Sequence, residues 1–158
     1  MRDPLPLRGL RVLAISSFGA GPWATMLLAD LGAEVIKIED PRTGGDTARN
    51  VPPDSEEVEN DSLYFQSMNR NKRSLTLNLR SEEGRALFRR LVRVSDVVYN
   101  NLRGDQPAKL GLRYVDLHHE NPRIVCAACS GYGTENSKAA EPGYDFIMQA
   151  LTGYMALT

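Results

Sequence analysis

Short apolar runs rich in β-branched residues alternate with longer segments of helical periodicity along the chain. The apolar runs lie at residues 11–16, 33–39, 96–101 and 123–130, and residues 74–79 alternate between polar and apolar positions, as a half-buried strand does. Strands that alternate with helices are typical of a parallel sheet with crossover helices. The pattern therefore predicts the α/β fold class, with a Rossmann-like parallel sheet and flanking helices.

The segments between these runs carry helix signals. Residues 18–22 form a Gly- and Pro-containing turn into a helix that is expected to end at Gly32. Ser81 is placed to cap a second helix, because two glutamates follow it in the first turn. The expected buried face of this helix consists of Leu87, Leu91 and Val94, and shorter helices are expected at residues 63–68, 108–112 and 114–120.

Two segments show neither the alternation of a strand nor the periodicity of a helix. Residues 40–60 are rich in Pro, Gly and acidic side chains, so we expect an exposed excursion, and residues 130–143 form a second loop. An apolar helix is expected from about residue 144 to residue 157, and its apolar face needs a covering partner. We therefore expect residues 1–158 to be a single N-terminal portion of a larger fold.

Composition and charge narrow the classes of function. The 158 residues are 42% hydrophobic and 25% charged, as in a soluble globular domain, and the net charge of -1 gives no basic field to attract nucleic acid or an anionic membrane. The first residues lack an apolar signal core, and no run approaches the ~20 apolar residues of a membrane span, so a cytoplasmic location is expected. Cys126 and Cys129 form one C-x-x-C pair without a second ligand pair, which favours buried strand thiols over a metal or redox site.

Three polar segments are candidates for ligand binding. The Gly19-Ala20-Gly21 turn could bring backbone N–H groups to a phosphate, or it could be only a tight turn. Residues 69–73 place three cations and two amides before a strand, either as solvated surface or as a phosphate site. Residues 100–103 follow a strand at the edge where open α/β sheets bind ligands, although asparagines also close turns.

Asp145 is the one candidate nucleophile that the residues themselves bring forward. It is a carboxylate at an expected helix start, after a glycine-rich loop. The alternative is structural, because an aspartate there satisfies free N–H groups and the helix dipole. The chain has no Ser/His/Asp set, no His-rich cluster and no Walker-type loop, so most hydrolases and kinases are excluded.

Taken together, several segments in this order resemble the class III CoA-transferases, the CaiB/BaiF family, which also contains acyl-CoA racemases. The resemblance runs nearly from end to end of the chain. Its segments include residues 6–13, 20–22, 28–39, 69–74, 83–85, 109–112, 121–123, 130–133 and 142–145.

The resemblance implies transfer of CoA from an acyl-CoA donor to a carboxylic acid through an aspartyl-CoA intermediate, with CoA as substrate and without a metal. The family's aspartate follows a glycine in a segment that would fall beyond Thr158, so this chain alone is expected to be inactive. The pairs Gly45-Asp46 and Gly104-Asp105 come too early to be that segment. In the racemase branch a histidine occupies the place of Tyr144, so the tyrosine favours a transferase.

Carried over by position, the resemblance implies CoA contacts from the first turn, from the segment around the adenine, and from residues near the ribose and phosphates. Residues 142–145 would border the pantetheine channel, and the family's interlocked homodimer is expected. Residues 100–105 lack the aromatic and the proline that the family usually has there. A non-catalytic CoA-binding module and a generic dinucleotide-binding domain stay open as alternatives. The implied contacts are Ser17, Phe18, Gly19, Ala20, Leu77, Asn78, Leu79, Arg80, Asn101, Leu102, Arg103, Lys109 and Tyr144.

Overall fold

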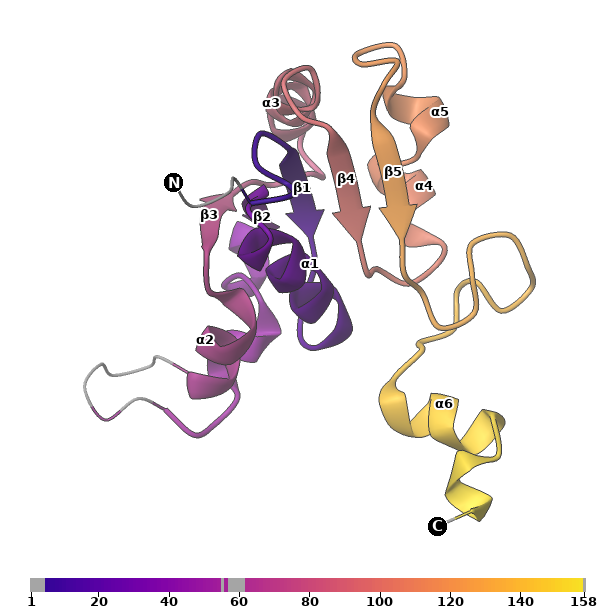
Figure 1. Cartoon of the computed structure of the whole chain (residues 1–158). Coiled ribbons are helices and arrows are strands. Elements are labelled where there is room, and N and C mark those ends of the chain that lie inside the picture. The colour runs from indigo at the N-terminus through magenta and orange to yellow at the C-terminus, as the bar shows by residue number, and fades with distance from the viewer. Residues whose placement is uncertain (1–4, 55, 57–61, 158) are drawn as a thin grey trace.

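Five parallel strands form the centre of the molecule (Figure 1). The structure is a computed structural model that describes residues 5–54, 56 and 62–157. The strand order is β3-β2-β1-β4-β5, so the chain runs outward from β1 in one direction and then restarts at β4 in the other. The α/β prediction with a Rossmann-like parallel sheet is confirmed. The strands are β1 (Arg11–Ile15), β2 (Glu34–Glu39), β3 (Lys72–Thr76), β4 (Val97–Asn100) and β5 (Val125–Ala128).

Helices cover both faces of the sheet. Helices α1 and α2 lie on one side, and α3, α4 and α5 lie on the other (Figure 1). A sixth helix, α6, lies apart from the sheet and is joined to it by the segment that follows β5 (Figure 1). The helices are α1 (Ala20–Asp30), α2 (Leu63–Asn69), α3 (Glu82–Val92), α4 (Gln106–Leu110), α5 (Tyr114–Leu117) and α6 (Asp145–Leu151), with 3-10 turns at Pro41–Thr43, Thr47–Asn50 and Tyr154–Ala156.

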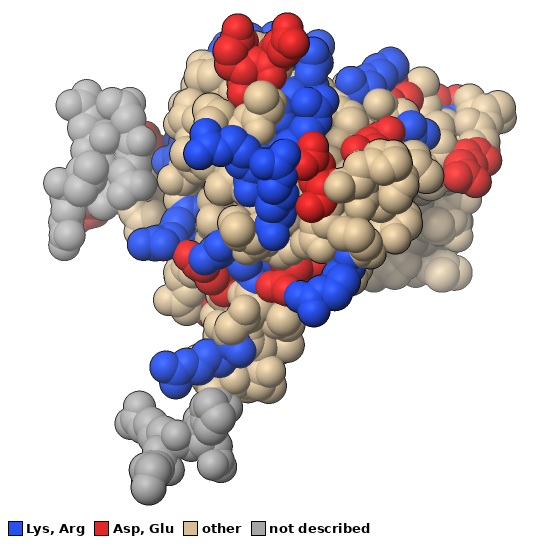
Figure 2. Space-filling model, turned by 90° about the horizontal axis from the view of Figure 1, so that it is seen from above, with Lys and Arg blue, Asp and Glu red and all other residues tan. Residues whose placement is uncertain are grey.

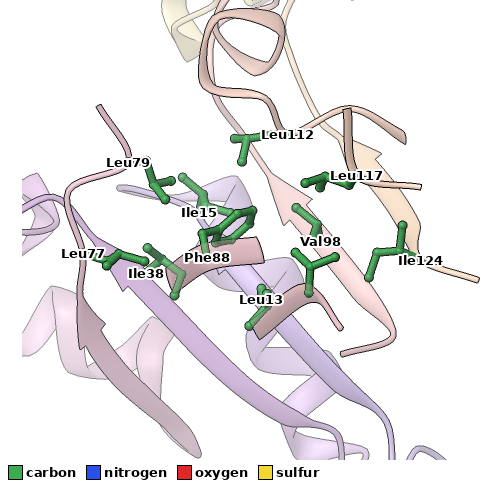
Figure 3. Packing of buried hydrophobic residues seen from close by; sticks show 11 residues of the cluster. Leu13, Ile15, Ile38, Leu77, Leu79, Phe88, Val98, Leu112, Leu117 and Ile124 are labelled. Carbon is green, nitrogen blue, oxygen red and sulfur yellow. The ribbon is translucent and has the colours of Figure 1, made fainter. Parts of the chain in front are cut away.

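The side chains of β1 divide the apolar core in two, because successive residues of a strand point to opposite faces. Val12 and Ala14 pack on the α1 side with Ala29. Leu13 and Ile15 face α3 and belong to the larger cluster (Figure 3). That larger cluster consists of Leu13, Ile15, Ile38, Leu77, Leu79, Phe88, Val92, Val98, Leu112, Leu117 and Ile124.

Helix α3 has the expected start but a different buried face. Ser81 Oγ accepts a hydrogen bond from the Gly84 N–H at 3.0 Å, as a helix cap does. The buried residues are Gly84, Phe88 and Val92, and Leu91 is half-buried against the larger cluster. Leu87 and Val94 are 47% and 59% exposed, so the expected face is correct only at Leu91. A Cβ on Gly84 would run into the Asn78 carbonyl, and this close approach fixes the rotation of the helix.

Three other expectations need correction. The strand expected at 74–79 ends at Thr76, because the chain then turns Leu77 and Leu79 into the core. The final helix ends at Leu151 rather than near residue 157, since Gly153 adopts a left-handed φ of 77°. Cys129 is exposed and Cys126 only half-buried, so the pair is not buried as expected.

The segment 40–60 is not simply an exposed excursion. Within its described part, the side chains of Asp46 and Ala48 are buried at 4% and 0% exposure. Asp46 Oδ1 accepts the Ala48 N–H at 2.9 Å and so starts the 3-10 turn Thr47–Asn50. Residues 55 and 57–60 lie outside the described residues. No helix in the part of the chain that the structure describes is long and apolar enough to cross a membrane.

Candidate functional site at the carboxyl edge of the sheet

The site lies where β1 and β4 end next to each other. Residues Val12–Ile15 pair in register with Val97–Asn100, so Ser16 and Asn101 leave the sheet at the same edge. The connections then diverge, since β1 leads through α1 to β2 on one side, while β4 leads to β5 on the other. Open α/β sheets bind ligands in the crevice that such a divergence leaves.

Asn101 joins the two strand ends through its side-chain amide. Its Oδ1 accepts the Ser17 N–H at 2.9 Å, and its Nδ2 donates to the Ser17 carbonyl at 2.9 Å. A Cβ on Gly21 would lie 2.5 Å from Asn101 Cγ, so only glycine lets the helix start approach this amide. Asn101 therefore does not merely close its own turn, which was one reading of the sequence. Asn100 closes its turn, since its Oδ1 accepts the Leu102 N–H at 3.3 Å, and its Nδ2 also donates to the Ala127 carbonyl at 3.5 Å.

The turn from β1 into α1 holds Phe18 in an uncommon backbone conformation. Phe18 has a φ of 68°, in the left-handed region that side chains with a Cβ disfavour. Its ring is 52% exposed and lies against the ring of Tyr64, with centroids 5.4 Å apart. Strained residues of this kind cluster at functional sites, where their surroundings hold them in place.

Asp46 is the buried anchor of this turn, a role that the sequence analysis did not predict. Its Oδ1 accepts from Ser17 Oγ at 2.8 Å and from the Phe18 N–H at 2.9 Å. Its Oδ2 pairs with Lys37 Nζ at 2.7 Å, and both side chains are almost fully buried. Burial alone would raise the pKa of Asp46, but the hydrogen bonds from Lys37 and from backbone N–H groups lower it. The one local signal was an aspartate ahead of Thr47 in the pattern of a helix cap.

Glu39 at the end of β2 is fully engaged within the protein. Arg49 donates to both carboxylate oxygens at 2.9 and 2.8 Å, Ser74 Oγ donates at 2.6 Å, and the Asp46 N–H donates at 2.9 Å. Burial would raise the pKa of Glu39, but these hydrogen bonds outweigh it and lower the pKa to about 2. An acidic residue near this place binds the ribose in dinucleotide-binding folds. Here its lone pairs are occupied, which speaks against the dinucleotide alternative.

The segment expected around an adenine lies at the same edge, beyond β3. Leu77 and Leu79 are 8% and 7% exposed, and their side chains belong to the larger core cluster. Asn78 Oδ1 accepts the Arg80 N–H at 3.0 Å, and Arg80 is exposed. The segment thus offers a ligand its backbone and Arg80, rather than an apolar wall of leucines.

Arg103 and Lys109, the cations expected near phosphates, converge on one carboxylate. Arg103 donates to both oxygens of Asp105 at 2.6 and 3.0 Å, and Lys109 Nζ lies 2.5 Å from Asp105 Oδ2. Hydrogen bonds from Arg103 and Lys109 lower the pKa of Asp105. Leu102 is half-buried against the core. The structure therefore brings the two cations together, but around an internal partner.

Tyr144 and Asp145 lie at the start of α6, the helix that stands apart from the sheet (Figure 1). The side chain of Tyr144 is 72% exposed. Asp145 Oδ2 accepts from Gln149 Nε2 at 2.7 Å, and this interaction takes the place of the expected cap on free backbone N–H groups. The preceding loop does reach the site, because the Asp105 N–H donates to the Ala139 carbonyl at 3.1 Å.

The basic segment 69–73 is engaged by the protein itself. Arg70 and Asn71 both bond to Asp30, Arg73 pairs with Glu34, and Lys72 donates to the carbonyls of Pro22 and Met68. Figure 2 shows Lys and Arg side chains lying among Asp and Glu side chains on the face seen from above. Among the described residues, no three His, Cys, Asp or Glu side chains are grouped as a metal site requires.

These features define a Rossmann-type α/β protein whose strand order reverses between β1 and β4, the place at which open α/β sheets bind ligands. The chain belongs to CoA-transferase family III, whose model matches residues 7–158. It is 43% identical over 156 residues to a succinate–glutarate CoA-transferase from Agrobacterium fabrum, which covers 97% of this chain. It is 42% identical to an acetyl-CoA:oxalate CoA-transferase from Acetobacter aceti over 97% of the chain.

Solved structures agree with the family assignment. The crystal structure of a CaiB/BaiF family protein from Brucella suis superposes with a TM-score of 0.87 at 42% identity, over 99% of this chain and 41% of that one. The chain spans 39% and 38% of the lengths of the Agrobacterium and Acetobacter relatives. The resemblance that the sequence motifs carried is thereby confirmed.

Proposed function

We propose that residues 1–158 form the CoA-holding part of a CoA-transferase, which moves CoA from an acyl-CoA donor to a free carboxylic acid. The observation that carries the proposal is the Asn101 amide, which fixes the turn at residues 17–20 against the end of β4 in a chain of this family. It joins two neighbouring strand ends at the edge where open α/β sheets bind ligands.

The charges at this edge suit the phosphates of CoA. Arg80 is exposed at one end of the edge, and Arg103 and Lys109 lie beyond β4 at the other. Guanidinium and ammonium groups bind phosphates through charge-assisted hydrogen bonds. The exposed Phe18 ring and Tyr144 supply apolar surface that the adenine or the pantetheine could cover.

The chemistry proposed for the whole protein is covalent catalysis by a carboxylate. The carboxylate attacks the thioester carbonyl, the C–S bond breaks, and a mixed anhydride and CoA thiolate result. The thiolate then attacks the aspartyl carbonyl, which releases the donor acid and leaves aspartyl-CoA. The acceptor acid repeats these two steps in reverse order, so that new acyl-CoA leaves and the aspartate is regenerated.

We place this aspartate outside residues 1–158. Asp46 and Asp105, the two aspartates that follow a glycine, are both held in ion pairs with cations of the protein, which makes their carboxylates weaker nucleophiles. Asp145 is exposed and is the alternative within the chain. A homodimer belongs to the same proposal.

A binding measurement separates CoA from dinucleotides. We expect CoA to raise the Tm of the protein as its gene encodes it, and NAD to leave the Tm unchanged, because Glu39 is not free for a ribose. Stabilisation by NAD alone would overturn the proposal.

An exchange assay then tests the reaction. Labelled succinate, glutarate and oxalate, the acids in the names of relatives, are the first acceptors to offer with an acyl-CoA donor. Label that enters acyl-CoA supports the transferase. Tight CoA binding without exchange would instead indicate a non-catalytic module, and solvent deuterium at the α-carbon of an acyl-CoA would indicate a racemase.

A further inference from the structure

A buried ion pair binds the residues that directly follow β1. Lys37 of β2 is 1% exposed, and its Nζ donates to the Ser16 carbonyl and to Asp46 Oδ2, both at 2.7 Å. The other oxygen of Asp46 accepts from Ser17 Oγ and from the Phe18 N–H. Consecutive polar groups of residues 16–18 are thus bound by two side chains that a ligand cannot touch.

Stability does not explain an ion pair in this place. Taking two charges out of water is costly, and apolar side chains of similar volume often replace a buried pair without loss. Apolar side chains could not, however, accept the Phe18 N–H or donate to the Ser16 carbonyl. What the ion pair supplies is therefore the geometry of the turn, including the left-handed φ of Phe18.

We propose that Lys37 and Asp46 are positioning residues for acyl-CoA, which hold the turn at residues 17–20 in its binding shape before the ligand arrives. A preformed turn spares the ligand the entropic cost of ordering it. The inference rests on the proposed function, since it assumes that this turn contacts CoA. In this proposal the segment 40–50 acts on the ligand indirectly, because its Asp46 holds the turn that contacts CoA.

Two double variants separate the hydrogen bonds from the charges. Lys37→Met with Asp46→Leu removes both, whereas Lys37→Met with Asp46→Asn keeps an Oδ1 that can accept the Phe18 N–H. Neither variant leaves a lone buried charge, which would itself unfold the protein. Glu34→Gln on the same strand is the matched control, because it breaks the ion pairs to Arg11 and Arg73 at the opposite edge of the sheet.

We expect the Met/Leu variant to raise the Kd for CoA about tenfold, equivalent to ~1.4 kcal/mol. The Km for acyl-CoA should rise in parallel while kcat stays within about twofold, since correctly bound substrate still reacts. The Met/Asn variant should recover most of the affinity, and Glu34→Gln should leave it unchanged. A lower binding stoichiometry with unchanged Kd in the Met/Leu variant would mean a merely structural role and would overturn the proposal.

Amide hydrogen exchange makes the test independent of CoA. The Phe18 N–H should lose protection in the Met/Leu variant and keep it in the Met/Asn variant, while the Val98 N–H in the core of β4 stays protected in both. Persistent protection of Phe18 in the Met/Leu variant would refute positioning. Failure of the unmodified protein to bind CoA would refute the proposed function instead, and the exchange result would still decide whether the ion pair sets the turn.

Discussion

Replacement of Asn101 by alanine tests whether the bridge between β1 and β4 holds the site. The change removes two hydrogen bonds to the Ser17 backbone, both 2.9 Å long. At 0.5–1.5 kcal/mol for each bond, the free energy of unfolding should fall by about 1–3 kcal/mol. For a chain of this size the Tm should then fall by roughly 3–9 °C. Calorimetry measures that loss directly.

Asn121→Ala is the matched control. Asn121 also anchors backbone groups with its amide, since its Nδ2 donates to the carbonyls of Val92 and Ser95 at 3.1 and 2.8 Å. It lies before β5, at the edge of the sheet opposite to the site. Asn121 Oδ1 also accepts the Arg123 N–H at 3.0 Å, so we expect Asn121→Ala to lose at least as much stability as Asn101→Ala. A weaker CoA affinity is expected only from Asn101→Ala, measured by titration calorimetry well below either Tm.

Two results would refute this reasoning. If Asn101→Ala bound CoA as tightly as the unmodified protein, the turn at residues 17–20 would not depend on the bridge. If both variants weakened CoA binding equally, the effect would come from general destabilisation and the site would not be localised at this edge. Asn101→Asp adds a check, because it keeps the acceptor for the Ser17 N–H but turns a second oxygen toward the Ser17 carbonyl, and it should be the least stable of the three.

Three further predictions follow from other contacts. Phe88→Ala should lower the free energy of unfolding by about 3–5 kcal/mol, because Phe88 is 2% exposed in the larger core cluster. Urea denaturation measures this loss. The lowered pKa of Glu39 stabilises the fold fully above its ordinary value of 4.5, and this contribution should be lost as the pH falls toward about 2. In the Glu39→Gln variant the free energy of unfolding, measured by denaturation at a series of pH values, should therefore fall less steeply below pH 4.5. Asp105→Asn should tighten CoA binding and steepen its salt dependence, since it releases the Arg103 and Lys109 side chains for phosphates; unchanged affinity would mean that these cations do not face the ligand.

The order and type of most elements could be predicted because each has a local signal. Period-2 and period-3.6 patterns, the Ser81 cap and the left-handed Gly32 all act within a few residues. The rotation of α3 could not be predicted in this way. Leu87, Leu91 and Val94 recur at helical spacing just as Gly84, Phe88 and Val92 do, and the close approach of Gly84 to the Asn78 carbonyl, which favours the second set, is a tertiary contact.

The sequence predicted where along the chain the candidate site lies, but not which distant residues hold it together. The turn at residues 17–20 and Asn101 follow strands, and strand ends can be read from a pattern. The partners of that turn cannot, because Asp46 and Asn101 are 29 and 84 residues away from Ser17. Nothing in the composition of residues 40–50 distinguishes a solvated loop from one that carries a buried carboxylate.

Three aspartates at similar motifs show how surroundings decide chemistry. Asp46 accepts hydrogen bonds from Lys37, Ser17 and two backbone N–H groups, and Asp105 is held by two cations. Asp145 accepts a hydrogen bond from Gln149 and stands on a helix away from the sheet. An attacking carboxylate needs a free lone pair and a place beside the thioester. The first two carboxylates are held in ion pairs and the third stands apart from the sheet, which is why our proposal places the nucleophile outside these residues and gives residues 16–18 and 101 the task of holding the ligand.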